Sequence, residues 1–358
     1  MMSVFLFLAA AATQPLPPAP PPPPKAWPTR EGDVVLPAFR FGSGETLPTL
    51  RMHYTTLGAP HRDASGAIDN AVMVLHGTGG TGKQFLRPQF ADELYGPGQP
   101  LDIRRYWIIL PDNIGHGKSS KPSDGLRMSF PKYDNDDMVS AQHAMLLKLG
   151  VTRLRLIMGT SMGCMQAFVW GETYPRFARA LMPMACEPVE IAGLNRMWRQ
   201  LAISGIKADP AWNGGAYRAQ PMAGLRAAQN LLFVAGAAPL LYQAQYPTRA
   251  SASAFADQSV NRALSDLDAN DLIYQLDSSR NYNPWPKLER ITAPVTWINS
   301  ADDFINPRNL ALPEAAVKRM PAARFRLIPE SADTHGHGTH TWAKFWKADL
   351  SALLERSN

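Results

Sequence analysis

The sequence is poor in cysteine and in charge, and its interior has no long apolar run. Two cysteines in 358 residues exclude a disulfide-rich scaffold and a metal site built from several cysteines. Beyond the N-terminus no stretch approaches the roughly 18 apolar residues of a membrane-spanning helix, so no membrane span is predicted. Charged residues make up 18% of the chain, and the net charge of +6 is scattered, which argues against a nucleic-acid partner. The hydrophobic fraction of 45% is enough for a packed core.

The first thirty residues have a different composition. Residues 4–12 (VFLFLAAAA) are apolar and end in small residues, as in a secretory signal peptide, although no Lys or Arg precedes them. Nine of the 32 prolines follow between Pro15 and Pro28, and such a run forms a stiff polyproline II spacer because proline lacks the backbone N–H. We predict a signal peptide over 1–13, a Pro-rich linker over 14–30 and a secreted or periplasmic protein. A wrongly assigned start codon would instead leave the protein in the cytoplasm.

From residue 31 onward, strand-like and helix-like segments alternate. Several strand-like segments are continuously apolar, which is typical of strands buried on both faces of a parallel sheet. Strands are predicted over 34–39, 50–56, 71–76, 106–111, 153–158, 180–185, 294–299 and 325–329. Helices are predicted over 135–149, 162–174 and 341–354. The pattern predicts an α/β fold with an eight-stranded, mostly parallel sheet flanked by helices.

One stretch interrupts this alternation. Residues 188–287 show no convincing strand pattern and are rich in Ala, Gln, Met and Trp. We predict that they form a helical cap, inserted between two parts of the core at 31–187 and 288–358.

The sharpest motif is 159–163 (GTSMG), the only G-x-S-x-G in the chain. It follows the apolar residues 154–158 and opens a predicted helix, which is the context in which this motif carries a nucleophilic serine. A tight turn there pushes the serine side chain out above the sheet, and Gly159 and Gly163 let neighbouring backbone approach. Ser161 is therefore the predicted nucleophile. The alternative is a helix N-cap with turn glycines on either side.

A nucleophilic serine needs a histidine base that a carboxylate orients. His335, His337 and His340 are the only histidines after the serine, and all three lie between the last predicted strand and the last predicted helix. His337 is preferred over His340 as the base because the glycines beside it let its loop reach the serine. A metal site made of these histidines is disfavoured because the cluster contains no glutamate and no cysteine lies near it.

The carboxylate is expected after the predicted strand 294–299, where Asp302 and Asp303 follow. Asp303 is preferred because Pro307 comes four residues later, the usual spacing when such a loop turns into the next helix. Asp302 would then cap the helix or hydrogen-bond the loop.

The segment 76–82 (HGTGGTG) follows a predicted strand and contains four glycines. Acyl transfer develops negative charge on the carbonyl oxygen, which backbone N–H groups must stabilise. One N–H is expected from Met162, the residue after the nucleophile, and the other from Thr78 in this loop. A phosphate-binding loop is disfavoured because Gln84, rather than Ser or Thr, follows Lys83.

Beyond the bare motif, 159–167 (GTSMGCMQA) with 137–139 (DMV) resembles the homoserine O-acetyltransferase family of the α/β-hydrolase superfamily. Further matches in the predicted cap lie at 202–203 (AI), 209–212 (DPAW) and 214–217 (GGAY). The resemblance covers the chain from about residue 45 to the end.

This resemblance implies an α/β-hydrolase fold and a ping-pong mechanism through an acyl-serine. It also implies Ser161, Asp303 and His337 as the catalytic triad. The family uses an arginine to hold the carboxylate of its amino-acid substrate, and Arg280 is our candidate for that role. Two features depart from the family. Cys164 stands where the family usually has a glycine, and the loop 76–79 (HGTG) is closer to ordinary hydrolases.

Two enzymatic functions follow. We predict a serine hydrolase that acts on a small ester or acyl compound; the alternative is a homoserine O-acetyltransferase that uses acetyl-CoA. Both share the acyl-serine, but acetyl-CoA is scarce outside the cytoplasm, so the predicted signal peptide favours hydrolysis. A non-catalytic binding protein is disfavoured because all three triad residue types occur in the expected order.

The partner is thus a small-molecule ester, no cofactor or metal is predicted, and a homodimer is one option for the oligomeric state. Cys164 and Cys186 are expected to be small buried residues, with a disulfide between them left open.

Overall fold

The computed structural model describes residues 25–358. The predicted signal peptide and residues 14–24 of the predicted linker lie outside the described residues. The last residues before the first strand contact the core, because the Trp27 indole N–H donates to Asp92 at 3.0 Å and its ring packs edge-on against Tyr95.

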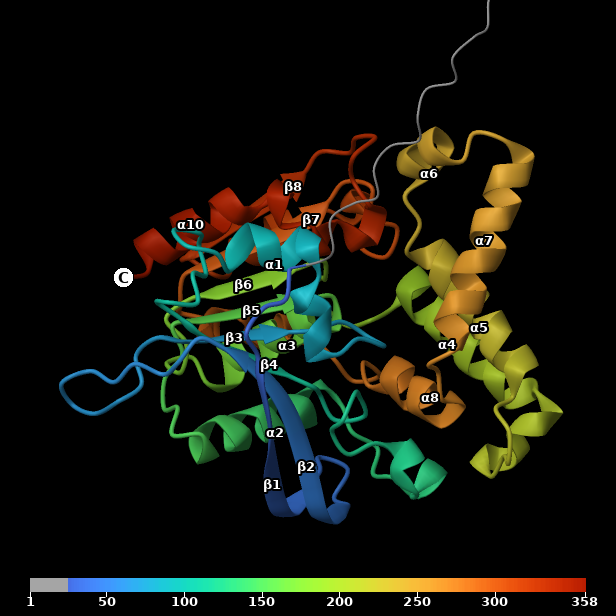
Figure 1. The fold of residues 1–358 in the computed structure, drawn as a ribbon, viewed down its shortest axis with the longest axis horizontal. Coiled ribbons are helices and arrows are strands. Elements are labelled where there is room, and N and C mark those ends of the chain that lie inside the picture. Colours follow the sequence, from blue (N-terminus) through green and yellow to red (C-terminus); the bar gives the residue numbers. More distant parts are fainter. Residues whose placement is uncertain (1–24) are drawn as a thin grey trace, which may run out of the picture.

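The centre of the molecule is one sheet of eight strands in the order β1-β2-β4-β3-β5-β6-β7-β8 (Figure 1). β2 pairs antiparallel with β1 and β4, and all neighbours from β4 to β8 are parallel. The strands are β1 (Arg30–Arg40), β2 (Thr46–Leu57), β3 (Ala71–Leu75), β4 (Trp107–Pro111), β5 (Leu156–Thr160), β6 (Leu181–Met184), β7 (Val295–Ser300) and β8 (Ala323–Ile328). The predicted eight-stranded, mostly parallel sheet is confirmed.

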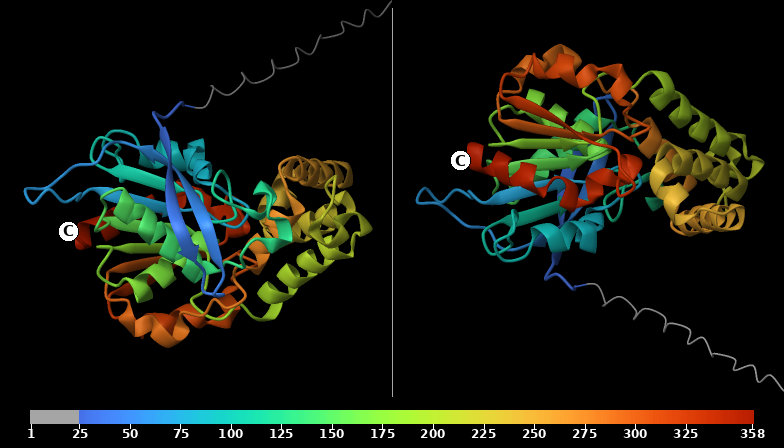
Figure 2. Two further views of the ribbon diagram at one scale, coloured as in Figure 1. Left: turned by 90° about the horizontal axis from the view of Figure 1, so that it is seen from below. Right: turned by 90° about the horizontal axis from the view of Figure 1, so that it is seen from above.

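The apolar runs form strands because both faces of the sheet are covered. In β3, Ala71, Met73 and Leu75 join one hydrophobic cluster, while Val72 and Val74 join the cluster on the opposite face. The first cluster includes residues of α2 (Asn135–Lys148) and α3 (Met162–Thr173), and the second includes residues of α1 (Pro88–Leu94) and α10 (Lys347–Arg356). Figure 2 shows these helices on the two sides of the sheet. A short helix, α9 (Leu312–Val317), precedes β8.

Five helices lie between β6 and β7 and form a cap beyond one end of the sheet (Figure 1). They are α4 (Gly193–Ala208), α5 (Met222–Ala235), α6 (Pro239–Gln245), α7 (Arg249–Leu264) and α8 (Ala269–Asp277). The cap has a small hydrophobic core of its own, which includes Trp198, Leu225 and Leu272. In the part of the chain that the structure describes, no helix is long and apolar enough to cross a membrane.

Candidate active site

Ser161 lies in the sharp turn between β5 and α3. Its backbone has φ 53° and ψ −114°, a strained conformation for a residue with a side chain, which the surrounding packing must hold. A Cβ atom on Gly159 would lie 1.9 Å from the carbonyl oxygen of Gly163, and one on Gly163 would lie 2.2 Å from that of Leu75. The two motif glycines are therefore required by close backbone packing, and the turn presents Ser161 at the end of the sheet that the cap covers.

The structure brings Ser161, His337 and Asp303 together in one hydrogen-bonded chain. Nε2 of His337 lies 2.9 Å from the Ser161 Oγ, and its Nδ1 lies 2.8 Å from Oδ2 of Asp303. The three residues come from the ends of β5 and β7 and from the loop after β8. This arrangement lets the imidazole accept the serine proton while the carboxylate fixes the orientation of the ring.

Asp303 is buried and fully bonded. Its carboxylate accepts hydrogen bonds from the backbone N–H of Ile305 at 2.8 Å, from the Asn306 side chain at 2.9 Å and from His337. Burial alone would raise the pKa of Asp303, but the charge and hydrogen bond of His337 and the bonds from Asn306 and Ile305 outweigh it and hold the pKa below its usual value. Asp303 is therefore a carboxylate at neutral pH.

Asp302 holds the histidine loop rather than the imidazole. Its Oδ2 accepts from the Thr334 hydroxyl at 2.8 Å and from the backbone N–H of Gly336 at 2.9 Å, and its Oδ1 accepts from the hydroxyl of Ser300. The two neighbouring carboxylates thus act on two different parts of the same loop.

The other two histidines of the cluster do not contact Ser161. His340 is bonded through Nδ1 to the carbonyl oxygen of His337, and burial, with a smaller contribution from the charge of His337, lowers its pKa to about 3. His335 stacks on Trp342 with ring centroids 4.0 Å apart. No group of three potential metal ligands occurs among residues 25–358.

The predicted oxyanion donors lie next to the serine. Met162 is the first residue of α3, where a backbone N–H has no partner within the helix. Thr78 lies in a turn closed by the N–H of Gly80 donating to the carbonyl of Gly77 at 3.0 Å. A Cβ on Gly77 would lie 3.2 Å from the Cβ of Ser161, so this loop approaches the serine closely.

A buried polar network, which sequence reasoning missed, supports that loop. The His76 side chain donates from Nδ1 to the Gly77 carbonyl at 2.9 Å and accepts at Nε2 from the backbone N–H of Asn113 at 3.0 Å. Gln142 of α2 donates to the Asn113 side chain and also to Gln166 of α3 at 2.8 Å. The side-chain amide of Gln142 therefore links the oxyanion loop, through Asn113 and His76, to the helix that follows Ser161. Gln166 is the last residue of the motif at 161–166 (SMGCMQ). This motif is the one sequence signal that could have indicated that Gln166 takes part in the network.

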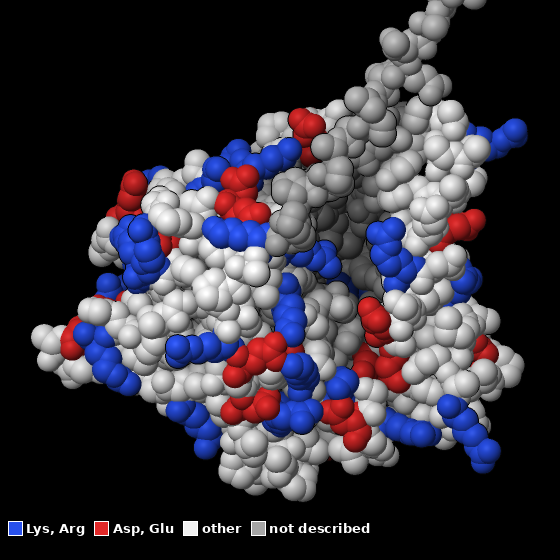
Figure 3. All heavy atoms as spheres, in the orientation of Figure 1, with Lys and Arg blue, Asp and Glu red and all other residues white. Residues whose placement is uncertain are grey.

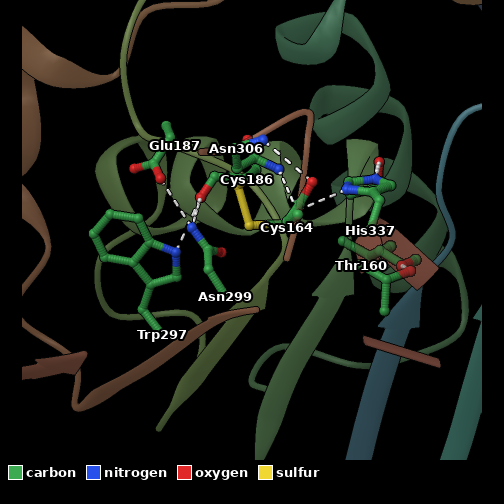
Figure 4. Close-up of a disulfide and its surroundings, with 11 residues drawn as sticks. Thr160, Cys164, Cys186, Glu187, Trp297, Asn299, Asn306 and His337 are labelled. Atoms are coloured by element: carbon green, nitrogen blue, oxygen red, sulfur yellow. Dashed lines mark hydrogen bonds and ion pairs between the residues drawn. A yellow bond between two sulfur atoms is a disulfide. The ribbon is translucent and has the colours of Figure 1, made fainter. Parts of the chain in front are cut away.

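Cys164 and Cys186 form a disulfide, and their Cα atoms are 5.8 Å apart (Figure 4). Both cysteines are buried, as expected, and the structure resolves the question of a disulfide, which the sequence left open. Cys164 lies in the first turn of α3, and Cys186 follows β6. The bridge therefore clamps the helix behind Ser161 to the neighbouring strand end. Sequence could not decide this pairing because it depends on a distance between two elements.

Glu187, next to the disulfide, is a buried carboxyl group. One of its oxygens accepts from the side-chain amide of Asn299 at 2.9 Å (Figure 4). Burial, with smaller contributions from Asp303 and Glu314, raises the pKa of Glu187 to about 9. Glu187 is therefore a neutral acid at pH 7, and Asp303 is the charged carboxylate beside the histidine.

Arg280 does not join the other predicted site residues. Its guanidinium donates to the backbone carbonyls of Tyr133 at 2.8 Å and Lys132 at 3.0 Å, so it anchors α8 to the segment before α2. A different arginine is buried in the cap. Arg199 of α4 is 3% exposed, and its one side-chain hydrogen bond among the described residues is to Asn195 at 2.9 Å. Burial, with a smaller contribution from Arg196, lowers the pKa of Arg199 to about 10.

A cavity of about 470 Å³ lies between the core and the cap. Gly79 and Gly80 of the oxyanion loop line one side, and Asp271 and Gln275 of α8 line the other. Figure 3 shows the hollow between the two parts, with charged side chains of both signs around it. The cavity borders the loop that carries Thr78, while Ser161 and His337 are not among its lining residues.

The fold and this site define an α/β hydrolase. The family described as alpha/beta hydrolase fold matches residues 70–334. A homoserine O-succinyltransferase from Magnetococcus marinus is 29% identical over 87% of this chain and 79% of its own. A homoserine O-acetyltransferase from Pelobacter propionicus is 30% identical over 75% of this chain and 80% of its own. Another, from Solidesulfovibrio magneticus, is 36% identical, and there the matched segment spans about half of each protein. The chain belongs to the homoserine O-acetyltransferase-like family of α/β hydrolases.

Solved structures of both transferases and esterases share this architecture. The homoserine O-acetyltransferase from Bacillus anthracis has a TM-score of 0.81 at 23% identity and covers 92% of this chain and 98% of its own. The acetyl esterase MekB has a TM-score of 0.79 at 25% identity, covering 91% of this chain and 97% of its own. The architecture therefore does not by itself separate the two kinds of enzyme.

Proposed function

We propose that the protein is an exported serine esterase that hydrolyses short acyl esters through an acyl-serine. The observation that carries this proposal is the hydrogen-bonded chain from Ser161 through His337 to Asp303 at a strained strand-to-helix turn. This catalytic triad activates a serine for attack on a carbonyl carbon. The similarity to an acetyl esterase of known structure supports a short acyl group.

Each residue has one role in the reaction. The Ser161 oxygen attacks the ester carbonyl while Nε2 of His337 takes its proton, and the N–H groups of Met162 and Thr78 stabilise the oxyanion. His337 then gives the proton to the departing alcohol, which leaves the acyl-serine. In the second half, His337 takes a proton from water, the hydroxide attacks the acyl group, and the proton returns to Ser161. Asp303 keeps the imidazole in the tautomer that both halves need.

The choice of water as acceptor rests on compartment. Disulfides persist in oxidising surroundings and are rare in the cytosol, so the Cys164–Cys186 bridge supports the export that the leader sequence suggests. Acetyl-CoA would be scarce there, whereas water and esters are available. Mass spectrometry of the mature N-terminus from native cells tests the location: cleavage near residue 13 supports export, and an intact leader on a cytoplasmic protein contradicts it.

The activity is tested with the purified mature protein and p-nitrophenyl acetate. We expect release of p-nitrophenol and acetate in the absence of homoserine, and no O-acetylhomoserine when homoserine is added. Ser161→Ala is the control and should lose at least about 10⁴-fold in rate while keeping its fold. Equal rates in the two proteins would refute the assignment of the nucleophile.

A second function, homoserine O-acetyltransferase, is favoured by one specific observation besides the relatives. A transferase needs a cation for the carboxylate of its acceptor, and Arg199 is a buried guanidinium with no carboxylate partner among the described residues. Acetyl-CoA and homoserine would then give O-acetylhomoserine with little hydrolysis. Arg199→Met would raise the KM for homoserine more than it lowers kcat.

A further inference from the structure

The end of the sheet opposite Ser161 carries a second concave site. A cleft of about 670 Å³ opens where β5, β6 and β7 begin, and β5 leads from this end to the serine at its other end. Figure 1 places the end of α10, which borders the cleft, on the side of the molecule away from the cap. The cleft is therefore separate from the candidate active site.

Four arginines line this cleft, and none of its eleven lining residues has an acidic side chain. Arg153 and Arg176 are exposed and Arg179 is half-buried, and their guanidinium groups make no hydrogen bond or ion pair with any residue from 25 to 358. Exposed arginines elsewhere differ: Arg104 pairs with Asp102 at 2.6 Å, whereas Arg218 and Arg249 of the cap make no ion pair with any residue from 25 to 358. What distinguishes the cleft is that three unpaired arginines share one concave site. The cleft thus gathers three arginines that no acidic side chain of the described residues pairs with.

The fourth arginine is held in place by the protein. Arg356 donates to the Val295 carbonyl at 2.6 Å and the Thr296 hydroxyl at 2.9 Å, and burial lowers its pKa, with a further contribution from the charge of Arg324. Arg155, beneath the cleft, shows the same effect, since burial and the charge of Arg179 lower its pKa. Positive charges therefore lie near one another at this end of the sheet, and they would attract a bound anion.

The C-terminus of α10 accounts for one member of this cluster, because Arg356 lies in its last turn, but helix ends do not account for Arg176 and Arg179. The C-terminus of a helix stabilises cations, but its field falls off within the last turn. α3 ends at Thr173, and Arg176 and Arg179 lie three and six residues beyond it. Their charge is therefore available to a ligand.

We propose that this cleft binds an anion that carries two or more phosphate groups. The planar guanidinium fork pairs with phosphate oxygens through two parallel hydrogen bonds, and three free forks around one cleft match more than one phosphate. The volume lies in the range of small-molecule sites, about 300 to 1,000 Å³. Soluble polyphosphates and phosphate-bearing lipid headgroups both present this chemistry.

Calorimetric titration with tripolyphosphate tests the soluble source. We expect saturable binding to the wild type and at least about tenfold weaker binding to Arg176→Gln/Arg179→Gln, because two charge-assisted hydrogen-bond donors are removed. The matched control is Arg218→Gln/Arg249→Gln, which removes two exposed charges from the cap and should bind within about twofold of wild type. Ester hydrolysis should be unchanged in both variants, which shows that they are folded, and Arg153→Gln serves as an independent cleft variant.

Cosedimentation with phosphatidylcholine vesicles, with and without phosphatidic acid, tests the lipid source with the same variants. Binding of either probe that depends on the cleft arginines supports the proposal and identifies the source. If neither probe binds the wild type, or if the cleft and control variants weaken binding equally, the cleft is not a phosphate site.

Discussion

The core and the cap contribute to the candidate site in different ways. On the core side, Asp303 accepts from three residues, Asp302 ties down the loop of His337, and a disulfide clamps the helix that follows Ser161. Every one of these contacts restrains a position. The core therefore determines which bond is formed and broken.

The cap is built more loosely. Leu194, Met197 and Leu201 of α4 are each more than half exposed, at 52%, 60% and 58%, while Arg199 of the same helix is buried without a carboxylate partner among the described residues. The comparison teaches that the core fixes the positions of Ser161, His337 and Asp303, and it leads us to expect that the cap, rather than the core, selects the acyl acceptor.

The largest effect among the core contacts is expected at the two neighbouring carboxylates. Asp303→Asn should lower kcat by about 10³ to 10⁴, because the imidazole is left in the wrong tautomer. Asp302→Asn removes one charge from the same loop without touching the imidazole and should cost about tenfold or less. Steady-state kinetics on p-nitrophenyl acetate separates them, and equal losses would show that the two aspartates share one role.

The disulfide should contribute to stability rather than to chemistry. Cys164→Ser/Cys186→Ser should lower the free energy of unfolding by about 3 kcal/mol, as expected for a loop of 22 residues, and should leave kcat within a few-fold. Urea unfolding followed by tryptophan fluorescence measures the change, and wild type in reductant should match the variant. Two titratable thiols in unreduced, denatured protein would contradict the bridge.

Glu187 should make stability depend on pH. Its folded pKa of about 9 lies above the value of 4.5 for an unfolded glutamate, so the native state holds an extra proton between these values. The free energy of unfolding is therefore highest below about pH 4.5 with respect to this group, and falls as pH rises toward 9. Glu187→Gln should flatten that slope and raise stability on the order of 5 kcal/mol at pH 8, since each pKa unit corresponds to about 1.4 kcal/mol. A slope unchanged in the variant would assign it to other groups.

The smallest effect is expected in the cap. Arg199→Met should change the hydrolysis of neutral esters by no more than about threefold, because no charged acceptor takes part. Arg196→Met is the control, because Arg196 is a half-buried arginine of the same helix that pairs with Asp277 at 3.5 Å. A large loss of activity confined to the Arg199 variant would mean that the cap takes part in the chemistry. The catalytic roles would then not be separated between the core and the cap.

Much of the core could be predicted because local patterns determine it. Continuous apolar runs mark buried strands, and the fold places the ends of β5 and β7 and the loop after β8 beside one another, which is why Ser161, Asp303 and His337 could be chosen. Boundaries were less accurate: the strand predicted over 153–158 is β5 at Leu156–Thr160, because apolar composition does not mark where ladder pairing begins.

Features that depend on packing between distant elements could not be predicted. The disulfide required the distance between α3 and the end of β6. Arg280 was chosen by resemblance, but the packing of α8 directs its guanidinium to the carbonyls before α2. Arg199 was not singled out because nothing in its local sequence shows that α4 buries it.

The fate of the acyl-serine tests the central claim most directly. Intact-protein mass spectrometry after rapid quenching with p-nitrophenyl acetate should find one acetyl group on the wild type and none on Ser161→Ala. We predict that this group is lost in water at the turnover rate and that homoserine does not accelerate the loss. An acetylated protein that persists in water and is discharged only by homoserine would contradict the esterase and identify a transferase.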